Sequence, residues 1–162
     1  MKTHKEFAED FAQEAGKIMK ENFSLGMKKG WKGDKTPVTE TDLRINSLLI
    51  KEIQNRFPDH SIIGEEESDQ IKNSEYVWVC DPVDGTIPFS HGIPISTFSL
   101  ALTQNGKSIL GVVYDPFQDR LFSATLGSGT FLNGTQVHVS TKTDFQEIVG
   151  AYESFKRDKY DV

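Results

Sequence analysis

The sequence predicts an α+β fold in which two helices pack on a largely antiparallel sheet. Two segments with apolar side chains at helical spacing come first, within residues 5–56. From residue 61 onward, short stretches rich in β-branched and aromatic residues alternate with Asn-Gly and Asp-Pro turns. Such turns are typical of strands that are joined by hairpins. Helices followed by hairpin-linked strands indicate one layer of helices on one sheet.

The first helix is predicted over residues 5–23. Its apolar residues recur at spacings near 3.6, which is typical of an amphipathic helix, and they are Phe7, Phe11, Ala15, Ile18 and Met19. Residues 26–35 then combine three glycines with several lysines. Glycine interrupts regular structure, so this segment is predicted to be a mobile basic loop.

The second helix is predicted to start near Thr39–Asp42 and to run to about Arg56. Threonine and aspartate are good N-terminal caps, and Pro58 ends the helical pattern. Its predicted buried face consists of Ile45, Leu48, Leu49 and Ile53.

The remaining elements are predicted strands. Asn105-Gly106 and Asn133-Gly134 are strong hairpin signals, and Asp115-Pro116 marks a further turn. The predicted strands cover residues 61–64, 76–81, 97–103, 108–114, 120–125, 129–132, 136–140 and 148–152.

Composition narrows the possible partners. The chain has 162 residues and a net charge of −6, which argues against binding to nucleic acid or to an anionic membrane surface. No apolar run is long enough to span a membrane. The single cysteine, Cys80, fits a reducing compartment, so a cytoplasmic location is expected. Cys80 is interpreted as a buried core residue rather than a reactive thiol.

The most informative segment is residues 80–86, Cys-Asp-Pro-Val-Asp-Gly-Thr. It places Asp81 and Asp84 at the end of an apolar stretch. Mg²⁺ prefers carboxylate and carbonyl oxygens and often binds together with substrate phosphate. Asp81, Asp84 and the carbonyl of Val83 offer such oxygens. The N–H groups of Gly85 and Thr86 offer donors to a phosphate, especially if a helix begins there.

Two further acidic positions lie at the edges of predicted elements. Asp42 lies at a helix start, and Glu65, Glu66 and Glu67 follow a short strand. Taken alone, the glutamates are typical of a solvated turn, and Asp42 of a helix cap. Together with Asp81 and Asp84 they predict a cleft where carboxylates repel one another and a divalent cation relieves the repulsion.

At this point the chain resembles the inositol monophosphatase superfamily of Mg²⁺-dependent, lithium-sensitive phosphomonoesterases. The resemblance rests on four segments in the family's order, which are residues 35–42 (KTPVTETD), 63–66 (IGEE), 78–89 (WVCDPVDGTIPF) and 91–94 (HGIP). It implies the N-terminal half of the family's layered α/β/α/β/α fold. It also implies hydrolysis of a small polyol or sugar phosphate by metal-activated water.

The resemblance implies a role for each matching residue. Glu65, Asp81 and the Val83 carbonyl are expected to hold one Mg²⁺. Asp81 is expected to bridge to a second Mg²⁺ that Asp84 also binds.

The remaining roles concern the water and the phosphate. Thr86, hydrogen-bonded to Asp42, is expected to orient the attacking water and take up its proton, so Asp42, Glu65 and Thr86 are the expected catalytic residues. Asp84, Gly85 and Thr86 are expected to contact phosphate, and Glu66 to support the metal ligands. Two or three Mg²⁺ ions and a homodimer are expected in the complete enzyme.

The sequence departs from the family's pattern in two places. Pro88 lies where relatives often carry a polar residue, and proline removes an amide donor. The resemblance also implies a second domain with a metal-binding Trp-Asp motif, which this sequence does not contain. We therefore expect residues 1–162 to be the N-terminal metal-binding and catalytic domain, with the C-terminal domain absent. The alternatives are a regulatory metal-binding domain without turnover and a purely structural α+β module.

Overall fold

The computed structural model describes residues 3–25, 27, 29–31, 33, 37–68 and 74–144 of the chain. Three helices are present in this part, α1 (His4–Asn22), α2 (Glu40–Arg56) and α3 (Thr86–Ser90). The strands are β1 (Lys29–Trp31), β2 (Pro37–Thr39), β3 (Ser61–Gly64), β4 (Tyr76–Asp84), β5 (Thr97–Gln104), β6 (Lys107–Asp115), β7 (Arg120–Thr125), β8 (Gly129–Leu132) and β9 (Thr135–Val137).

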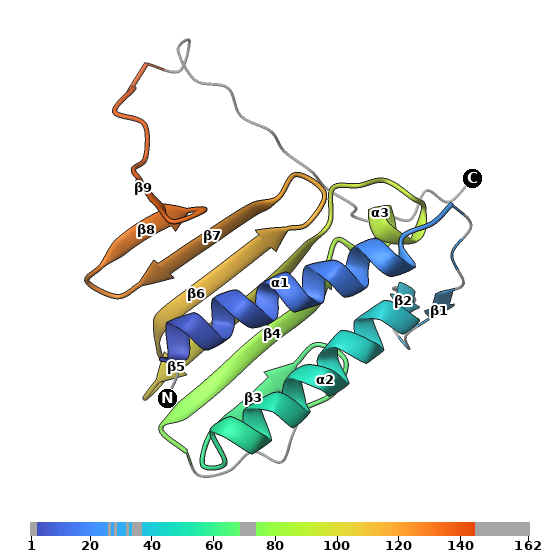
Figure 1. The fold of residues 1–162 in the computed structure, drawn as a ribbon, viewed down its shortest axis with the longest axis horizontal. Helices are drawn as coiled ribbons and strands as arrows, with labels where there is room; N and C mark the ends of the chain where they lie inside the picture. The colour runs from blue at the N-terminus through green and yellow to red at the C-terminus, as the bar shows by residue number, and fades with distance from the viewer. Residues whose placement is uncertain are drawn as a thin grey trace.

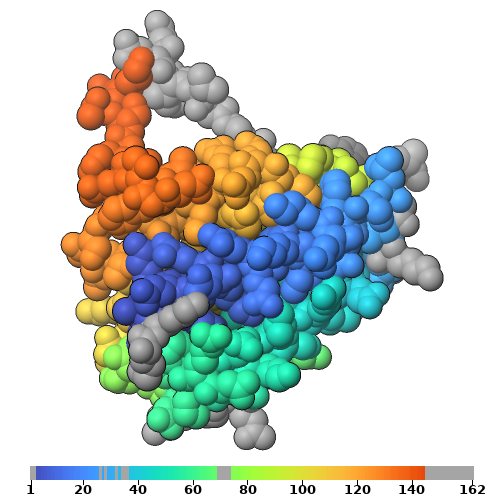
Figure 2. Space-filling model, viewed as in Figure 1, coloured from blue at the N-terminus to red at the C-terminus, as the bar shows by residue number. Residues whose placement is uncertain are grey.

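Strands β3 to β9 form one sheet in sequence order, and α1 and α2 lie side by side on one of its faces (Figure 1). β3 runs parallel to β4, and every later neighbour pair is antiparallel. In Figure 2 the two helices cover one part of this face, and the atoms of β7 and β8 (orange) remain visible beyond α1. This arrangement confirms the predicted α+β class and adds one parallel strand pair to it.

Both Asn-Gly hairpins form as predicted. Asn105 and Gly106 have φ angles of 51° and 77°, and Asn133 and Gly134 have φ angles of 48° and 79°. Two successive residues with positive φ make the turn type whose twist matches a tight hairpin. Strand β6 therefore follows β5 directly, and β9 follows β8.

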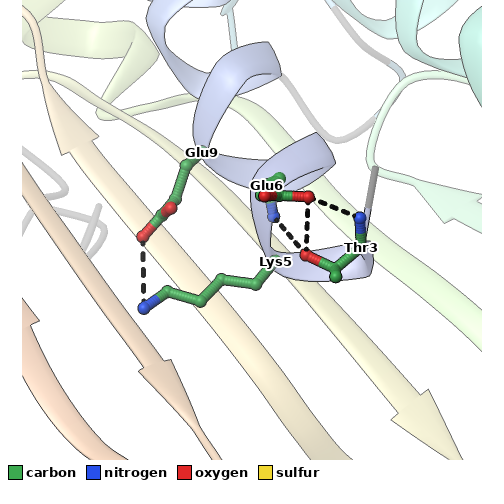
Figure 3. Close-up of polar contacts among 4 residues, drawn as sticks. All are labelled: Thr3, Lys5, Glu6 and Glu9. Atoms are coloured by element: carbon green, nitrogen blue, oxygen red, sulfur yellow. Dashed lines mark hydrogen bonds and ion pairs between the residues drawn. The ribbon is translucent and has the colours of Figure 1, made fainter. Parts of the chain in front are cut away.

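The N-terminus of α1 is closed by a reciprocal pair of hydrogen bonds (Figure 3). The Glu6 N–H donates to Thr3 Oγ1 at 3.2 Å, and the Thr3 N–H donates to Glu6 Oε2 at 2.7 Å. This capping box satisfies N–H groups that the helix leaves without partners. In the first two turns of the same helix, Lys5 Nζ lies 3.7 Å from Glu9 Oε1 (Figure 3).

The core lies between the two helices and the sheet. All five apolar residues predicted for the face of α1 are buried. On α2, Ile45, Leu49 and Ile53 are buried, whereas Leu48 packs at the margin of the core. Ring contacts connect α1 to the sheet, with ring centroids 5.4 Å apart for Phe7 and Trp78 and 5.7 Å apart for Phe11 and Phe98.

Residues 29–31 were expected in a loop but form strand β1, which pairs antiparallel with β2. Each strand is only three residues long and β1 contains Gly30, so no periodic pattern reveals them. The last described strand covers residues 135–137 rather than 136–140. The strand predicted at 148–152 lies outside the described residues. In the described part of the chain, no helix has the length and apolar character needed to cross a membrane.

Gly16 allows α1 to approach the sheet closely. A Cβ atom at this position would lie 2.3 Å from the Tyr114 ring and 2.9 Å from Pro116. Overpacking of this kind costs about 1–3 kcal/mol, which outweighs the roughly 1 kcal/mol gain in helix propensity from glycine to alanine.

We therefore predict that Gly16→Ala lowers the free energy of unfolding by about 1–2 kcal/mol in urea titrations. Gly111→Ala is the matched control, because a Cβ at Gly111 meets no atom within 4 Å. Equal stability of the Gly16 variant and the parent would contradict this account of the helix–sheet contact.

Candidate active site

The parallel pairing of β3 with β4 places two acidic residues at one edge of the sheet. Gly64 is opposite Cys80 in the last residue pair of the register, so the pairing of the two strands ends at these residues. The N–H of Glu65 then donates to the Cys80 carbonyl at 3.0 Å. Glu65 therefore follows directly beside Asp81.

A bulge in β4 shapes the next residues. Asp81 is opposite Ser99 and Asp84 is opposite Thr97, so the register shifts by one residue between them. Pro82, which has no N–H to give to a ladder, lies inside this bulge. The Val83 N–H turns back and donates to Asp81 Oδ1 at 3.2 Å. The bulge thus ends the regular ladder where Asp81, Val83 and Asp84 follow one another.

These residues line a cleft of about 290 Å³. Its lining comes from β2, the loop after β3, the end of β4 and α3, and consists of Pro37, Glu65, Asp81, Val83, Asp84, Gly85, Thr86, Ile87 and Pro88. Most of the residues singled out in the sequence thus meet at one place. Asp42 and Glu66 are not among the lining residues, and Glu66 is half-buried.

Asp42 lies behind the cleft and is connected to it through Thr86. Its Oδ2 accepts from the Thr39 N–H at 2.9 Å and from the Thr39 hydroxyl. The Thr86 hydroxyl lies 3.1 Å from Asp42 Oδ1 and 3.0 Å from the Val83 carbonyl oxygen. One hydroxyl proton serves both acceptors, so the oxygen of Thr86 keeps lone pairs for a third group. Burial raises the pKa of Asp42, and the hydrogen bonds from Thr39 and Thr86 oppose this rise.

Burial and neighbouring carboxylates raise the pKa of Asp81. Burial, the charge of Glu65, a hydrogen bond with Glu65 and the charge of Asp84 raise the pKa of Asp81 to about 8. The Val83 N–H lowers this pKa only in part. At neutral pH without a cation, the protonated form of Asp81 is therefore favoured, and its carboxyl is hydrogen-bonded to Glu65.

The donor set fits a hard divalent cation. Three carboxylates and the Val83 carbonyl line one cleft, and all of them are oxygen ligands of the kind that Mg²⁺ prefers. Among the residues that the structure describes, no three His, Cys, Asp or Glu side chains already surround a single point. The hydrogen bond between Asp81 and Glu65 brings these two side chains together in the cleft, where a cation could take its place.

Two neighbours of the cleft have structural roles. Cys80 is buried, and burial together with the charges of Asp81 and Glu65 raises its pKa well above the usual range, in line with its interpretation as a core residue. Ser96 was not noticed in the sequence, because a lone serine carries no pattern. It is buried, and its hydroxyl donates to the Gly85 carbonyl at 2.8 Å. Gly85 has a φ of 88°, so Ser96 holds the left-handed turn that opens α3.

The sequence of this chain is similar to those of known proteins. A model of the inositol monophosphatase family matches residues 1–160. Inositol monophosphatase 3 of Solanum lycopersicum is 38% identical over 157 residues, which cover 94% of this chain and 59% of the relative. Histidinol-phosphatase of Chlorobaculum parvum is 37% identical over 136 residues, which cover 83% of this chain and 52% of the relative. The chain thus spans little more than half the length of these relatives.

The fold matches as well. The solved structure of an IMPase from Thermotoga maritima superposes with a TM-score of 0.78 at 34% sequence identity. The match covers 84% of this chain and 53% of that structure. The sheet and its helices are therefore shared with proteins of this type.

The pKa of Asp81 predicts how stability depends on pH without a cation. A carboxyl whose folded-state pKa is raised stabilises the folded chain below its unfolded pKa, near 4, and loses this contribution as the pH rises to about 8. We predict that the free energy of unfolding of Asp81→Asn at pH 8 is higher than that of the parent, by roughly 1–3 kcal/mol after screening by solvent.

The difference in free energy of unfolding between Asp81→Asn and the parent should shrink toward pH 4. Urea titrations in a chelating buffer from pH 4 to 8 check this, with the exposed Asp59→Asn as control. A parent chain that is more stable than Asp81→Asn at pH 8 would contradict the account of the carboxylate cluster.

Proposed function

Because the chain belongs to the inositol monophosphatase family, we propose that residues 1–162 form the metal-binding and catalytic part of a Mg²⁺-dependent phosphomonoesterase. The observation that carries the proposal is the meeting of Glu65, Asp81 and Asp84 in one cleft with the hydrogen-bonded pair Asp42–Thr86. A cleft of about 290 Å³ suits a small phosphate ester.

The proposed ligands follow from the donor set. Glu65, Asp81 and the Val83 carbonyl would hold one Mg²⁺, and Asp81 and Asp84 a second. Magnesium supplies charge stabilisation to phosphoryl oxygens and makes a bound water more acidic. Because metal ligands must be deprotonated, Asp81 would lose its proton when it holds a cation. Glu66 lies next to Glu65 and is half-buried, which suits a supporting contact to the ligands better than direct coordination.

Thr86 and Asp42 are the proposed proton acceptors. The hydroxyl of Thr86 lines the cleft, and Asp42 receives its hydrogen bond from the protein side. With its proton directed to Asp42 or to the Val83 carbonyl, Thr86 offers a lone pair to a water in the cleft. A buried carboxylate behind the hydroxyl suits the uptake of a proton, because burial favours the protonated form of Asp42.

The substrate class is a small polyol or sugar phosphate. Relatives that match this chain are named for inositol monophosphate and for histidinol phosphate. Asp84, Gly85 and Thr86 line the cleft beside the carboxylates, and we propose that they contact the phosphate. Pro88 lies at the third position of α3, where the helix needs no backbone donor, so the proline does not disturb the turn.

A second candidate is a metal-binding domain of the same fold without turnover. The carboxylate cleft supports this candidate equally, because cation binding needs these side chains but no attacking water. Cation binding is common to both candidates, and phosphate release separates them.

We predict Mg²⁺-dependent release of inorganic phosphate from a panel that contains inositol monophosphate, histidinol phosphate and fructose bisphosphate. Asp81→Asn should abolish this release, because it removes the carboxylate proposed to contact both ions. Saturable Mg²⁺ binding without phosphate release across the panel would favour the second candidate. Phosphate release that is unchanged in Asp81→Asn would overturn the proposed site.

The role of Thr86 is testable with two matched variants. Thr86→Val keeps the shape of the side chain but removes the hydroxyl, and we predict a fall in kcat of about 10²–10⁴ with little change in KM. Thr86→Ser retains the hydroxyl and should keep kcat within about tenfold of the parent. Equal activity of the valine and serine variants would exclude the hydroxyl from catalysis.

A further inference from the structure

The loop that carries Glu65 is held from α2 by a residue that the proposed function does not use. Asn46 lies one helical turn after Asp42 on the buried side of α2 and is 1% exposed. Its Nδ2 donates to the Glu67 carbonyl at 3.0 Å. Residues four apart on a helix lie on the same face, so α2 directs Asp42 toward Thr86 and Asn46 toward the Glu65 loop.

The contact between Asn46 and this loop leaves no free space. A Cβ atom at Gly64 would lie 2.1 Å from Asn46 Oδ1 and 2.4 Å from the Glu67 carbonyl oxygen. The φ of Gly64 is not positive, so backbone conformation does not require glycine at this position. Glycine is needed because the Asn46 amide and the Glu67 carbonyl occupy the space where a Cβ would lie.

The side-chain oxygen of Asn46 gains little from this arrangement. Oδ1 is buried and accepts no hydrogen bond from any residue that the structure describes. A buried acceptor without a donor costs stability. An apolar side chain of the same size would avoid this cost but would also lose the bond from Nδ2 to the Glu67 carbonyl, so the fold gains little net stability from the amide.

We propose that Asn46 is a positioning residue that fixes Glu65 beside Asp81 for cation binding. The amide lies against the loop on both sides of Glu65, because Oδ1 occupies the space where a Gly64 Cβ would lie and Nδ2 donates to the Glu67 carbonyl. The N–H of Glu65 is at the same time fixed on the Cys80 carbonyl. With the backbone held on both sides, the Cα of Glu65 keeps one position beside Asp81, so only side-chain torsions remain to be fixed when a cation binds. The inference rests on the proposed function, because it assumes that Glu65 is a metal ligand.

The test uses Mn²⁺ as an oxygen-preferring probe in place of Mg²⁺ and follows free Mn²⁺ by electron paramagnetic resonance. Asn46→Leu replaces the amide by an apolar side chain of similar size, and Asn46→Ser removes most of it. Both should weaken Mn²⁺ binding by tenfold or more. In a chelating buffer, the melting temperature of Asn46→Leu should stay within about 3 °C of the parent, because removal of the unsatisfied oxygen offsets the lost bond to the Glu67 carbonyl.

Ser47→Ala is the matched control. Ser47 is adjacent on α2 and also contacts the loop, but only through an exposed bond of 3.3 Å between its hydroxyl and Glu67 Oε2. Its loss should leave Mn²⁺ affinity unchanged within threefold.

The outcomes separate this inference from the proposed function. Normal Mn²⁺ affinity in both Asn46 variants overturns the positioning role and leaves the proposed metal site standing. A loss of folding in both variants shows that Asn46 serves the fold, and also overturns the positioning role. A parent chain that does not bind Mn²⁺ overturns the metal site and the inference together.

Discussion

The structure of the cleft depends on the parallel pairing of β3 with β4. Parallel neighbours end at the same edge of a sheet, so Glu65 leaves β3 beside Asp81 on β4. Burial of Asp81 and the neighbouring charges of Glu65 and Asp84 disfavour its ionised form, so the pKa of Asp81 is raised. The bulge in β4 then adds Asp84 to the same place. A fold that held these groups apart would be more stable on its own but would offer nothing to a divalent cation.

The cleft is assembled from both sides of the sheet. Along β4, Trp78 and Cys80 are buried and Val79 is 40% exposed, so Asp81 continues the side of Val79, away from the helices. Asp42 approaches from the helix side and is fully buried. Thr86, at the start of α3, bridges the two by its hydrogen bond to Asp42 and its place in the cleft. Helix α2 thereby has two functions, since it covers the core and supports the cleft through Asp42 and Asn46.

Local patterns predicted more of this molecule than long-range ones did. The helices and both Asn-Gly hairpins follow from periodicity and turn chemistry, which are properties of neighbouring residues. The β1–β2 hairpin has no such pattern. The parallel pairing of β3 with β4 is a contact that sequence spacing does not reveal. Asp81 and Asp84 stand out because carboxylates are rare beside a buried strand. Asn46 and Ser96 act through single contacts with the backbone, so only the structure reveals them.

If the carboxylate cleft binds Mg²⁺ in exchange for a proton, calorimetric titration with Mg²⁺ at pH 7 in two buffers of different ionisation enthalpy should reveal the exchange. We expect saturable binding with release of about one proton per chain, and loss of both in Asp81→Asn, because ligands must be deprotonated to hold a metal. Absence of saturable binding, or binding that persists in Asp81→Asn, would exclude this exchange.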